Sequence, residues 1–449
     1  MGRLFGTDGV RGVANTELTP ELAYSIGRAG AYVLTKHANG RAKILVGRDT
    51  RISGPLLECA LVAGMCSVGA DVVISGVIPT PAIAYLVRTE GFDAGVMISA
   101  SHNPFEHNGI KYFSGTGYKL SDEIEEEIEA IILDNAVEIE NPTHEKVGNV
   151  TYDYSLCDKY IEFAKSTIDV DFSGMKIAID CANGASSMTA EKTLKGLGAE
   201  VTVINNTPDG ININNNCGST HIEGLMELVK NGDFVGGLAF DGDADRVLAV
   251  DSNGELVDGD KIMAICGLDM KERGILAKNA IVATVMSNLG LFVMGEKNGV
   301  NIPKTKVGDR YVLEEMLKEG YSIGGEQSGH VIFLEHNTTG DGLVTGLQLL
   351  SVVKRTGKTM AELATVMDTF PQVLINAKIK NENKEKYKED AEIMAVISAM
   401  EEEFASTGRV LIRPSGTEPL VRVMIEGKDV DVITEKARML ADLLEKKLG

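Results

Sequence analysis

The chain has 449 residues, of which 44% are hydrophobic and 24% are charged, and its formal net charge is −21. This length predicts about three or four domains, and the composition is typical of a globular protein. The strong negative charge argues against a nucleic-acid or membrane-surface partner, because both need a basic field. Any phosphate site must therefore be a local group of Arg, Lys and backbone N–H groups.

The N-terminal sequence and the cysteines indicate a compartment. MGRLFGTDGVRG lacks the apolar core of a signal peptide, and no apolar run approaches the length of a membrane span. The six cysteines form no CxxC pair and have no histidine at zinc spacing, so buried thiols in a reducing environment are expected. These features predict a cytoplasmic protein.

Short apolar strands alternate with helices from the N-terminus onward. Continuous apolar runs predict buried strands at 42–49, 70–78 and 92–100, and helical spacing predicts helices at 20–38, 54–69 and 80–90. An acidic helix over 121–134, with Ser121 as its cap, closes this block near residue 150. Alternation of this kind predicts a largely parallel sheet that is covered on both faces.

The same pattern recurs twice and then changes. Strands are expected at 176–184, 200–206 and 233–243, and then at 279–287 and 321–330 with a helix at 311–320 between them. Beyond 369–371, strands at 373–379, 409–416 and 420–427 lie among longer helices. We predict four domains, over 1–150, 151–255, 256–368 and 369–449.

The fold class is therefore α/β. It comprises three similar α/β domains with mixed, mainly parallel sheets and a smaller C-terminal α+β domain. In open parallel sheets, ligands bind at the carboxyl ends of the strands. The polar loops that follow strands in all four blocks are expected to surround one central cleft.

The first of these loops is SASHNP, residues 99–104, at the end of an apolar strand. Two hydroxyls and an imidazole at a strand end indicate either a capped turn or a mounted reactive group. The residues alone do not separate Ser99 from Ser101.

The second loop, DGDADR, carries Asp241, Asp243 and Asp245 at intervals of two. On a straight strand these carboxylates would lie roughly 6.5 Å apart, too far for one cation with oxygen ligands at about 2.1 Å. The segment must therefore curl, which the small residues Gly242 and Ala244 allow. A Mg²⁺ site is favoured over a solvated acidic turn, because three unneutralised carboxylates would repel one another.

Three further segments carry weaker signals. RPSGTEPLVR suits a phosphate dianion, with a structural hairpin turn as the alternative; its candidates are Arg413, Ser415, Gly416, Thr417 and Arg422. GEQSGH offers Glu326 and Ser328 to a pair of sugar hydroxyls, with a polar turn as the alternative. NNTPDGININNNCGST is expected to be a surface excursion.

Together, the motifs GTDGVRG, SASHNP, DGDADR, GEQSGH and RPSGTEP occur in this order over essentially the whole chain. The set closely resembles the α-D-phosphohexomutase superfamily. Gln327 and the stretches TVMSNLG and TKVGDRYV are similar to the branch that acts on glucosamine phosphates.

The resemblance implies that Ser101 is a phosphoserine that donates and recovers a phosphoryl group. Asp241, Asp243, Asp245 and an oxygen of that phosphate would hold one Mg²⁺ per chain. Glucosamine 6-phosphate would become glucosamine 1-phosphate through glucosamine 1,6-bisphosphate, which turns over within the cleft, and the product would feed peptidoglycan-precursor synthesis. A homodimer is also implied.

The resemblance assigns the remaining roles less sharply. Lys111 and His330 are preferred as proton carriers over His102 and Arg11. Glu326 and Ser328 would hold ring hydroxyls, and the RPSGTEP loop would hold the phosphate. A positive pocket is expected where six cations gather: Arg11, Lys111, Arg246, Arg310, Arg413 and Arg422.

Three rival functions stay open on the sequence. A phosphomannomutase or phosphoglucomutase would use the same residues. A metal-dependent phosphatase would use the acidic loop without recapturing the phosphoryl group. A non-catalytic regulator that binds sugar phosphates would carry no phosphate on Ser101.

Overall fold

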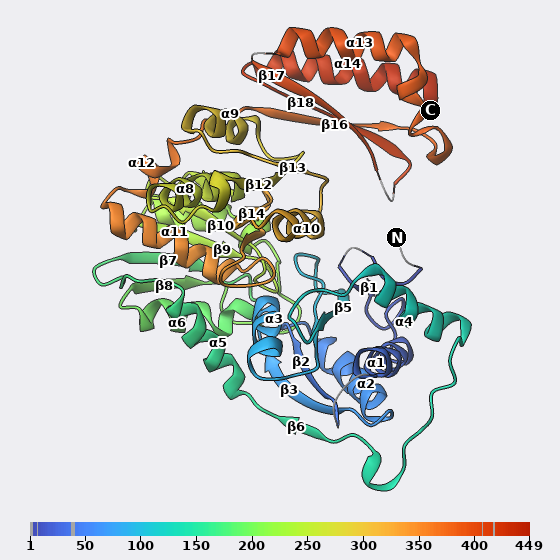
Figure 1. Ribbon diagram of the computed structural model, residues 1–449. Coiled ribbons are helices and arrows are strands. Elements are labelled where there is room, and N and C mark those ends of the chain that lie inside the picture. Colours follow the sequence, from blue (N-terminus) through green and yellow to red (C-terminus); the bar gives the residue numbers. More distant parts are fainter. Residues whose placement is uncertain (1–2, 7, 37–40, 406, 416–417) are drawn as a thin grey trace. The chain divides into compact units, whose positions relative to one another are not determined.

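The computed structural model describes residues 3–6, 8–36, 41–405, 407–415 and 418–449 (Figure 1). The predicted α/β class is confirmed, and four sheets follow one another along the chain. The chain divides into two compact units, Met1–Met286 with Asn301–Val366 and Ser287–Val300 with Met367–Gly449. The four predicted domain limits stay predictions.

The first sheet has the strand order β1-β5-β4-β2-β3-β6. Its strands are β1 (Val10–Val13), β2 (Lys43–Arg48), β3 (Asp71–Val77), β4 (Ala94–Ile98), β5 (His107–Ser114) and β6 (Val150–Tyr152). The sheet is mixed, because β2, β3, β4 and β6 pair in parallel while β5 runs antiparallel to β4 and β1. Residues 94–98 are all buried, as expected for a central strand covered on both faces.

Four helices accompany this sheet: α1 (Pro20–Thr35), α2 (Gly54–Cys66), α3 (Thr80–Thr89) and α4 (Asp122–Asp134). Helix α1 begins as its sequence predicts, because the Thr19 side chain accepts from the Leu22 N–H and proline stands in the first turn. The position of the predicted cap of α4 is confirmed. Ser121 occupies the N-cap position in an extended conformation, but its side chain accepts no capping hydrogen bond.

The second sheet has the order β11-β10-β9-β7-β8. Its elements are β7 (Lys176–Asp180), β8 (Glu200–Ile204), β9 (Gly236–Phe240), β10 (Val247–Asp251), β11 (Leu256–Val257), α5 (Ser155–Ser166), α6 (Ala190–Gly196) and α7 (Glu223–Lys230). Strands β7, β8 and β9 pair in parallel, and β10 turns back antiparallel to β9. The acidic loop is the connection between β9 and β10.

The third sheet has the order β13-β12-β14-β15. Its elements are β12 (Ile281–Thr284), β13 (Lys304–Thr305), β14 (Ile323–Gly325), β15 (Val331–Phe333), α8 (Gly259–Glu272), α10 (Asp309–Glu319), α11 (Gly342–Thr356) and α12 (Met360–Ala364). Strands β4, β9 and β14 each end directly before a motif loop, which places all three loops at carboxyl ends of strands.

The second unit contains a three-stranded antiparallel sheet of order β16-β18-β17. Its elements are β16 (Gln372–Lys378), β17 (Gly408–Pro414), β18 (Leu420–Gly427), α9 (Leu289–Asn298), α13 (Ala391–Phe404) and α14 (Val430–Leu448). Figure 1 shows α13 and α14 side by side on one face of this sheet, where Val423, Ile425 and Leu440 form part of the core. The expected α+β character of this block is confirmed.

The structure also tests the expected burial of the cysteines and the expected lack of a membrane-spanning helix. Cys157, Cys181, Cys217 and Cys266 are buried, whereas Cys59 is exposed and Cys66 half-buried, so the prediction of buried thiols is wrong for these two. Within the described parts of the chain, every helix is too short or too polar to cross a membrane.

Candidate active site

Ser101 is the first residue of the site, and it stands directly beyond β4 in a left-handed conformation with φ of 52°. A positive φ is uncommon for a residue other than glycine, and it indicates a backbone held by its surroundings. Here it directs the hydroxyl toward the second sheet, where Oγ donates to Asp241 Oδ2 over 2.6 Å. Ser101 is almost fully buried.

Ser99 faces the other way. Its hydroxyl donates to the buried Asp49 and accepts the backbone N–H of Ser101 at 3.0 Å. The structure therefore separates the two serines, which the residues alone did not, and only Ser101 faces the acidic loop.

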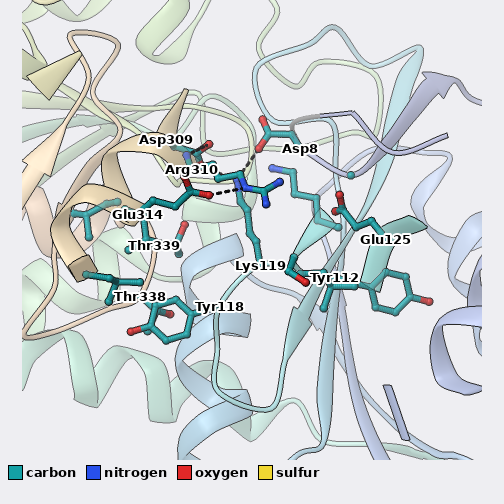
Figure 2. A pocket seen from close by; sticks show the side chains of 17 residues that line it. Asp8, Tyr112, Tyr118, Lys119, Glu125, Asp309, Arg310, Glu314, Thr338 and Thr339 are labelled. Atoms are coloured by element: carbon teal, nitrogen blue, oxygen red, sulfur yellow. Dashed lines mark hydrogen bonds and ion pairs between the residues drawn. The ribbon is translucent and has the colours of Figure 1, made fainter. Parts of the chain in front are cut away.

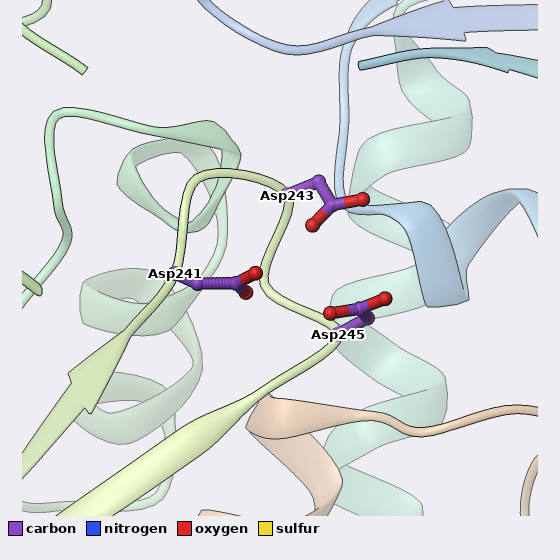
Figure 3. Close-up of side chains that lie close together, drawn as sticks. All are labelled: Asp241, Asp243 and Asp245. Atoms are coloured by element: carbon purple, nitrogen blue, oxygen red, sulfur yellow. The ribbon is translucent and has the colours of Figure 1, made fainter. Parts of the chain in front are cut away.

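The acidic loop curls as its spacing requires, with Ala244 in the left-handed region at φ of 58°. Figure 3 shows the carboxylates of Asp241, Asp243 and Asp245 on this one loop between β9 and β10. One ligand oxygen from each lies within 4.8 Å of the others, and all three residues are buried.

Two observations test whether this group fits a cation. The Oδ1 atoms of Asp243 and Asp245 are buried without a hydrogen-bond partner among the described residues. Burial, followed by the charges of Asp245 and Asp243, raises the pKa of Asp241 well above its usual value. A divalent cation would coordinate the carboxylate oxygens that have no hydrogen-bond partner and would neutralise the repulsion among the three carboxylates. The donor set therefore fits such an ion.

Lys111 and Thr80 contact the same carboxylate of the acidic loop. Lys111, from β5, places Nζ 2.8 Å from Asp243 Oδ2 and 4.0 Å from Asp245 Oδ2. The Thr80 hydroxyl at the start of α3 donates to Asp243 Oδ2 over 2.5 Å. Burial lowers the pKa of Lys111, but the charges of Asp243 and Asp8 outweigh it and raise the pKa above its usual value.

His330 enters from the third sheet, between β14 and β15. Its Nδ1 lies 3.6 Å from Asp245 Oδ2, and its Nε2 accepts the backbone N–H of Gly340 at 3.0 Å. A ring nitrogen that accepts carries no proton, so the proton of the neutral ring is on the nitrogen that faces Asp245. Loops from three successive sheets thus meet at the acids.

The serine loop, residues 99–104, contacts the acidic loop at Ser101 and Asp241, and a second contact joins His102 to Arg246. Arg246 Nη1 donates to His102 Nδ1 over 3.2 Å, and the Arg246 backbone N–H donates to Asp241 Oδ1 at 3.2 Å. Burial and the charges of Arg246 and Arg11 lower the pKa of His102 to about 4, which keeps the ring neutral near pH 7. His102 therefore orients Arg246 rather than Ser101.

A cavity of about 200 Å³ lies beside these groups, lined from both the first and the third blocks (Figure 2). Lys119 connects the two blocks, because its Nζ donates to Asp8 Oδ1 at 2.6 Å and to Asp309 Oδ2. Asp8 in turn binds Arg11 at 2.8 Å. Neither Lys119 nor Asp309 was predicted from sequence, since ion pairs between distant loops leave no local pattern.

Arg310 and the GEQSGH residues take different positions. The Arg310 guanidinium lies at the cavity and binds Asp122 and Glu314. Glu326 Oε1 accepts the Gly308 N–H at 3.1 Å, Gln327 Nε2 donates to Asp258 Oδ2 at 3.0 Å, and Ser328 is exposed. Glu326 is thereby tied to the loop that precedes α10.

The second unit carries the predicted phosphate loop. Arg413 and Arg422 are direct partners across β17 and β18, so their side chains leave the same face of the sheet. Ser415 is buried, and its Oγ accepts the Glu418 N–H at 3.1 Å. Lys384, which sequence reasoning missed, donates to the carbonyls of Ser415 and Glu418. Gly416 and Thr417 lie outside the described residues.

Four models of one family match the chain in succession. They are described as phosphoglucomutase/phosphomannomutase alpha/beta/alpha domain I at residues 2–138, domain II at 158–254, domain III at 258–370 and the C-terminal domain at 374–443. The matches together cover well over half of the chain.

Curated relatives match over the full length. Phosphoglucosamine mutase of Acetivibrio thermocellus is 63% identical and that of Ruminiclostridium cellulolyticum 62% identical, each over 100% of both chains. Phosphoglucosamine mutase of Clostridium novyi is 61% identical over 100% of this chain and 99% of its own.

Solved structures agree on the fold. A phosphoglucomutase/phosphomannomutase family protein of Burkholderia thailandensis aligns with a TM-score of 0.82 and 26% identity over 99% and 98% of the two chains. Aspergillus fumigatus N-acetylphosphoglucosamine mutase, solved with GlcNAc-6P and magnesium, aligns with a TM-score of 0.71 and 17% identity over 99% and 95%, which shows the fold alone. The chain therefore belongs to the phosphoglucomutase/phosphomannomutase family.

Proposed function

We propose that the protein interconverts glucosamine 6-phosphate and glucosamine 1-phosphate through a phosphoserine at Ser101. One observation carries the proposal: Ser101 Oγ, from the first sheet, lies 2.6 Å from Asp241 in the buried acidic group of the second sheet. A nucleophile mounted against a cation site is the arrangement that phosphoryl transfer needs. The full-length relatives named phosphoglucosamine mutase support the amino sugar as substrate.

The proposed resident ion is one Mg²⁺, held by Asp241, Asp243, Asp245 and an oxygen of the Ser101 phosphate. When bound, it supplies positive charge that stabilises the transferring phosphoryl group. The charges of the three acids are otherwise partly balanced by Lys111, which donates to Asp243. The buried donor set supports a hard divalent ion.

In the first transfer, the anomeric oxygen of glucosamine 6-phosphate bonds to phosphorus and the bond from phosphorus to Ser101 Oγ breaks. The hydroxyl proton is transferred to the released Ser101 oxygen, and we propose Lys111 or His330 as the group that carries it. Both lie at the acids from separate elements, within 4.0 Å of Asp245. The 1,6-bisphosphate then turns over, and the 6-phosphoryl group returns to Ser101 to release glucosamine 1-phosphate.

The remaining contacts serve the two orientations of the substrate. We propose that Arg413, Ser415, Gly416, Thr417 and Arg422 hold the non-reacting phosphate, as the pairing of Arg413 with Arg422 supports. Glu326 and Ser328 would take ring hydroxyls, with Arg11, Arg246 and Arg310 supplying further positive charge. A homodimer in the cytoplasm is proposed from the family resemblance, and light scattering of the purified protein tests the dimer.

Turnover with three substrates tests the function. We expect glucosamine 6-phosphate to react faster than glucose 6-phosphate or mannose 6-phosphate, with a hexose 1,6-bisphosphate as activator. Faster turnover of either neutral sugar phosphate would favour the rival mutase. Steady release of inorganic phosphate would identify a phosphatase, and the absence of phosphate on Ser101 in peptide mapping would favour a regulator.

A further inference from the structure

The Ser101 loop is held through its backbone as well as through its hydroxyl. The carbonyl oxygens of Ser101 and Asn103 each accept two hydrogen bonds, one from Arg51 and one from Asn214. Arg51 Nη2 donates to them at 2.9 Å and 2.8 Å, and Asn214 Nδ2 at 2.9 Å and 3.1 Å. A carbonyl oxygen has two lone pairs, so both acceptors are saturated.

The two donors come from different parts of the first unit. Arg51 follows β2 in the same sheet as the serine loop, is fully buried and pairs with Asp49 at 2.9 Å. Asn214 lies between β8 and α7, in the block that carries the acids. It therefore ties the nucleophile's backbone to the block that supplies its partner Asp241.

The fit around the Ser101 carbonyl is close on a third side. A Cβ at Gly242, in the acidic loop, would stand 2.5 Å from Ser101 O and 2.7 Å from Asn214 Nδ2. The carbonyl is thus enclosed by Arg51, Asn214 and the backbone of the acidic loop. Such enclosure is what a residue at φ of 52° needs to keep an unfavourable conformation.

The surroundings of the Asn214 side chain indicate that its amide acts as a hydrogen-bond donor. Its side chain is 7% exposed, and its Oδ1 is buried without a hydrogen-bond partner among the described residues. Since a carbonyl cannot donate, the amide must present Nδ2 to the two carbonyls. Its own backbone is left-handed at φ of 56°, a region that Asn tolerates better than most residues.

We propose that Asn214 is a positioning residue for phosphoryl transfer. By donating to the carbonyls of Ser101 and Asn103, it fixes the backbone that aims Ser101 Oγ at Asp241. The inference rests on the proposed mutase function. The surface excursion predicted for the Asn-rich loop is corrected here, because this asparagine is buried against the serine loop.

Two substitutions at Asn214 remove the donor in different ways. Asn214→Asp keeps the shape and the left-handed backbone but turns an acceptor oxygen toward two carbonyls. Asn214→Gly keeps the backbone conformation and adds no charge. Asn216 supplies matched controls, because it lies in the same loop at φ of 51° with its side chain exposed. The control variants are Asn216→Asp and Asn216→Gly.

We expect kcat for glucosamine 6-phosphate to fall by roughly tenfold to a hundredfold in both Asn214 variants, as for a displaced nucleophile. KM should stay within about threefold, because substrate contacts are unchanged. Both Asn216 variants should match the unmodified protein. The proposal would be overturned if kcat were unchanged in the Asn214 variants or if only KM rose. It would also be overturned if the loss of activity merely followed the unfolded fraction in thermal melts.

Hydrogen exchange separates the inference from the proposed function. Backbone amides in residues 99–107 should exchange faster in Asn214→Gly than in Asn216→Gly or the unmodified protein. Equal exchange rates in Asn214→Gly, Asn216→Gly and the unmodified protein would show that Asn214 does not hold the Ser101 loop. This result would overturn the proposal even if activity fell. If the unmodified protein showed no mutase activity, the proposed function would fail, while the exchange comparison would still decide whether Asn214 holds the loop.

Discussion

The Ser99 hydroxyl donates to Asp49 Oδ2 over 2.6 Å, inside a region where both residues are fully buried. Ser99 therefore supports the loop, and Ser101 two residues later is the group that can react. We expect Ser101→Ala to lower turnover by at least about a thousandfold, as for loss of a nucleophile. Ser99→Ala should cost about 1–3 kcal/mol of unfolding free energy, because it removes the bond to Asp49 and leaves the buried backbone N–H of Ser101 without its acceptor, and it should keep measurable turnover. Activity assays and chemical unfolding of both variants check this, and equal activity loss in the two would contradict it.

Gly242 can be tested as a steric contact. In Gly242→Ala the new Cβ would meet Ser101 O at 2.5 Å, and both are backbone positions that cannot rotate away. We expect a fall in turnover of at least roughly tenfold, because a small displacement of the nucleophile is costly. The control is Gly224→Ala in helix α7, where nothing lies within 4 Å of the added atom. That variant should keep full activity and gain up to about 1 kcal/mol of stability from helix propensity.

Cation binding is measurable without turnover. Mn²⁺ titrated into the metal-free protein and followed by electron paramagnetic resonance should show one tight site per chain. Asp243→Asn should weaken it by more than about tenfold, because a charged oxygen ligand is lost. The control is Asp233→Asn, since the Asp233 side chain is 97% exposed in the same block. Equal Mn²⁺ affinity in the two variants would exclude the acidic loop as the site.

Glu125, which lies in helix α4 and not in the acidic loop, should make the stability of the fold depend on pH. Burial is the main cause that raises its pKa to about 7, against an ordinary value of 4.5. Because the buried carboxyl holds its proton more tightly in the folded protein, the fold has its full stability below the carboxyl pKa of the unfolded chain. This stability is lost as pH rises through the folded-state pKa of about 7. Glu125→Gln should therefore raise the unfolding free energy at pH 8 by roughly 1 kcal/mol, since the partly exposed group is screened. Exposed Glu126→Gln should show no such gain, and urea unfolding between pH 4 and pH 8 checks both.

Much of the fold was predictable because buried parallel strands are continuous apolar runs. The runs at 42–49, 70–78 and 92–100 contain β2, β3 and β4. Strand β5 was missed, because its Asn108 and Lys111 are polar yet buried. Their partners, Ser53 and Asp243, are distant in sequence, so the compensation for burying them leaves no local signal.

The site was predictable where chemistry is local and not where it depends on distant contacts. Three acids at intervals of two imply a curl whatever surrounds them. By contrast, Asn214 lies among other asparagines of similar context, and only the folded chain shows which of them is buried. The ion bridge of Lys119 with Asp8 and Asp309 likewise joins residues more than a hundred positions apart.

The groups around Asp245 come from three consecutive parts of the chain, and His330 is the last of them to be synthesised. A nascent polypeptide that has released only its first two sheets holds the serine and the acids without the imidazole beside them. Such a polypeptide has one of the two proposed proton carriers, Lys111, and lacks the other, His330. Recombination that moved only the first two blocks into another gene would likewise transfer Ser101 and the three acids without His330.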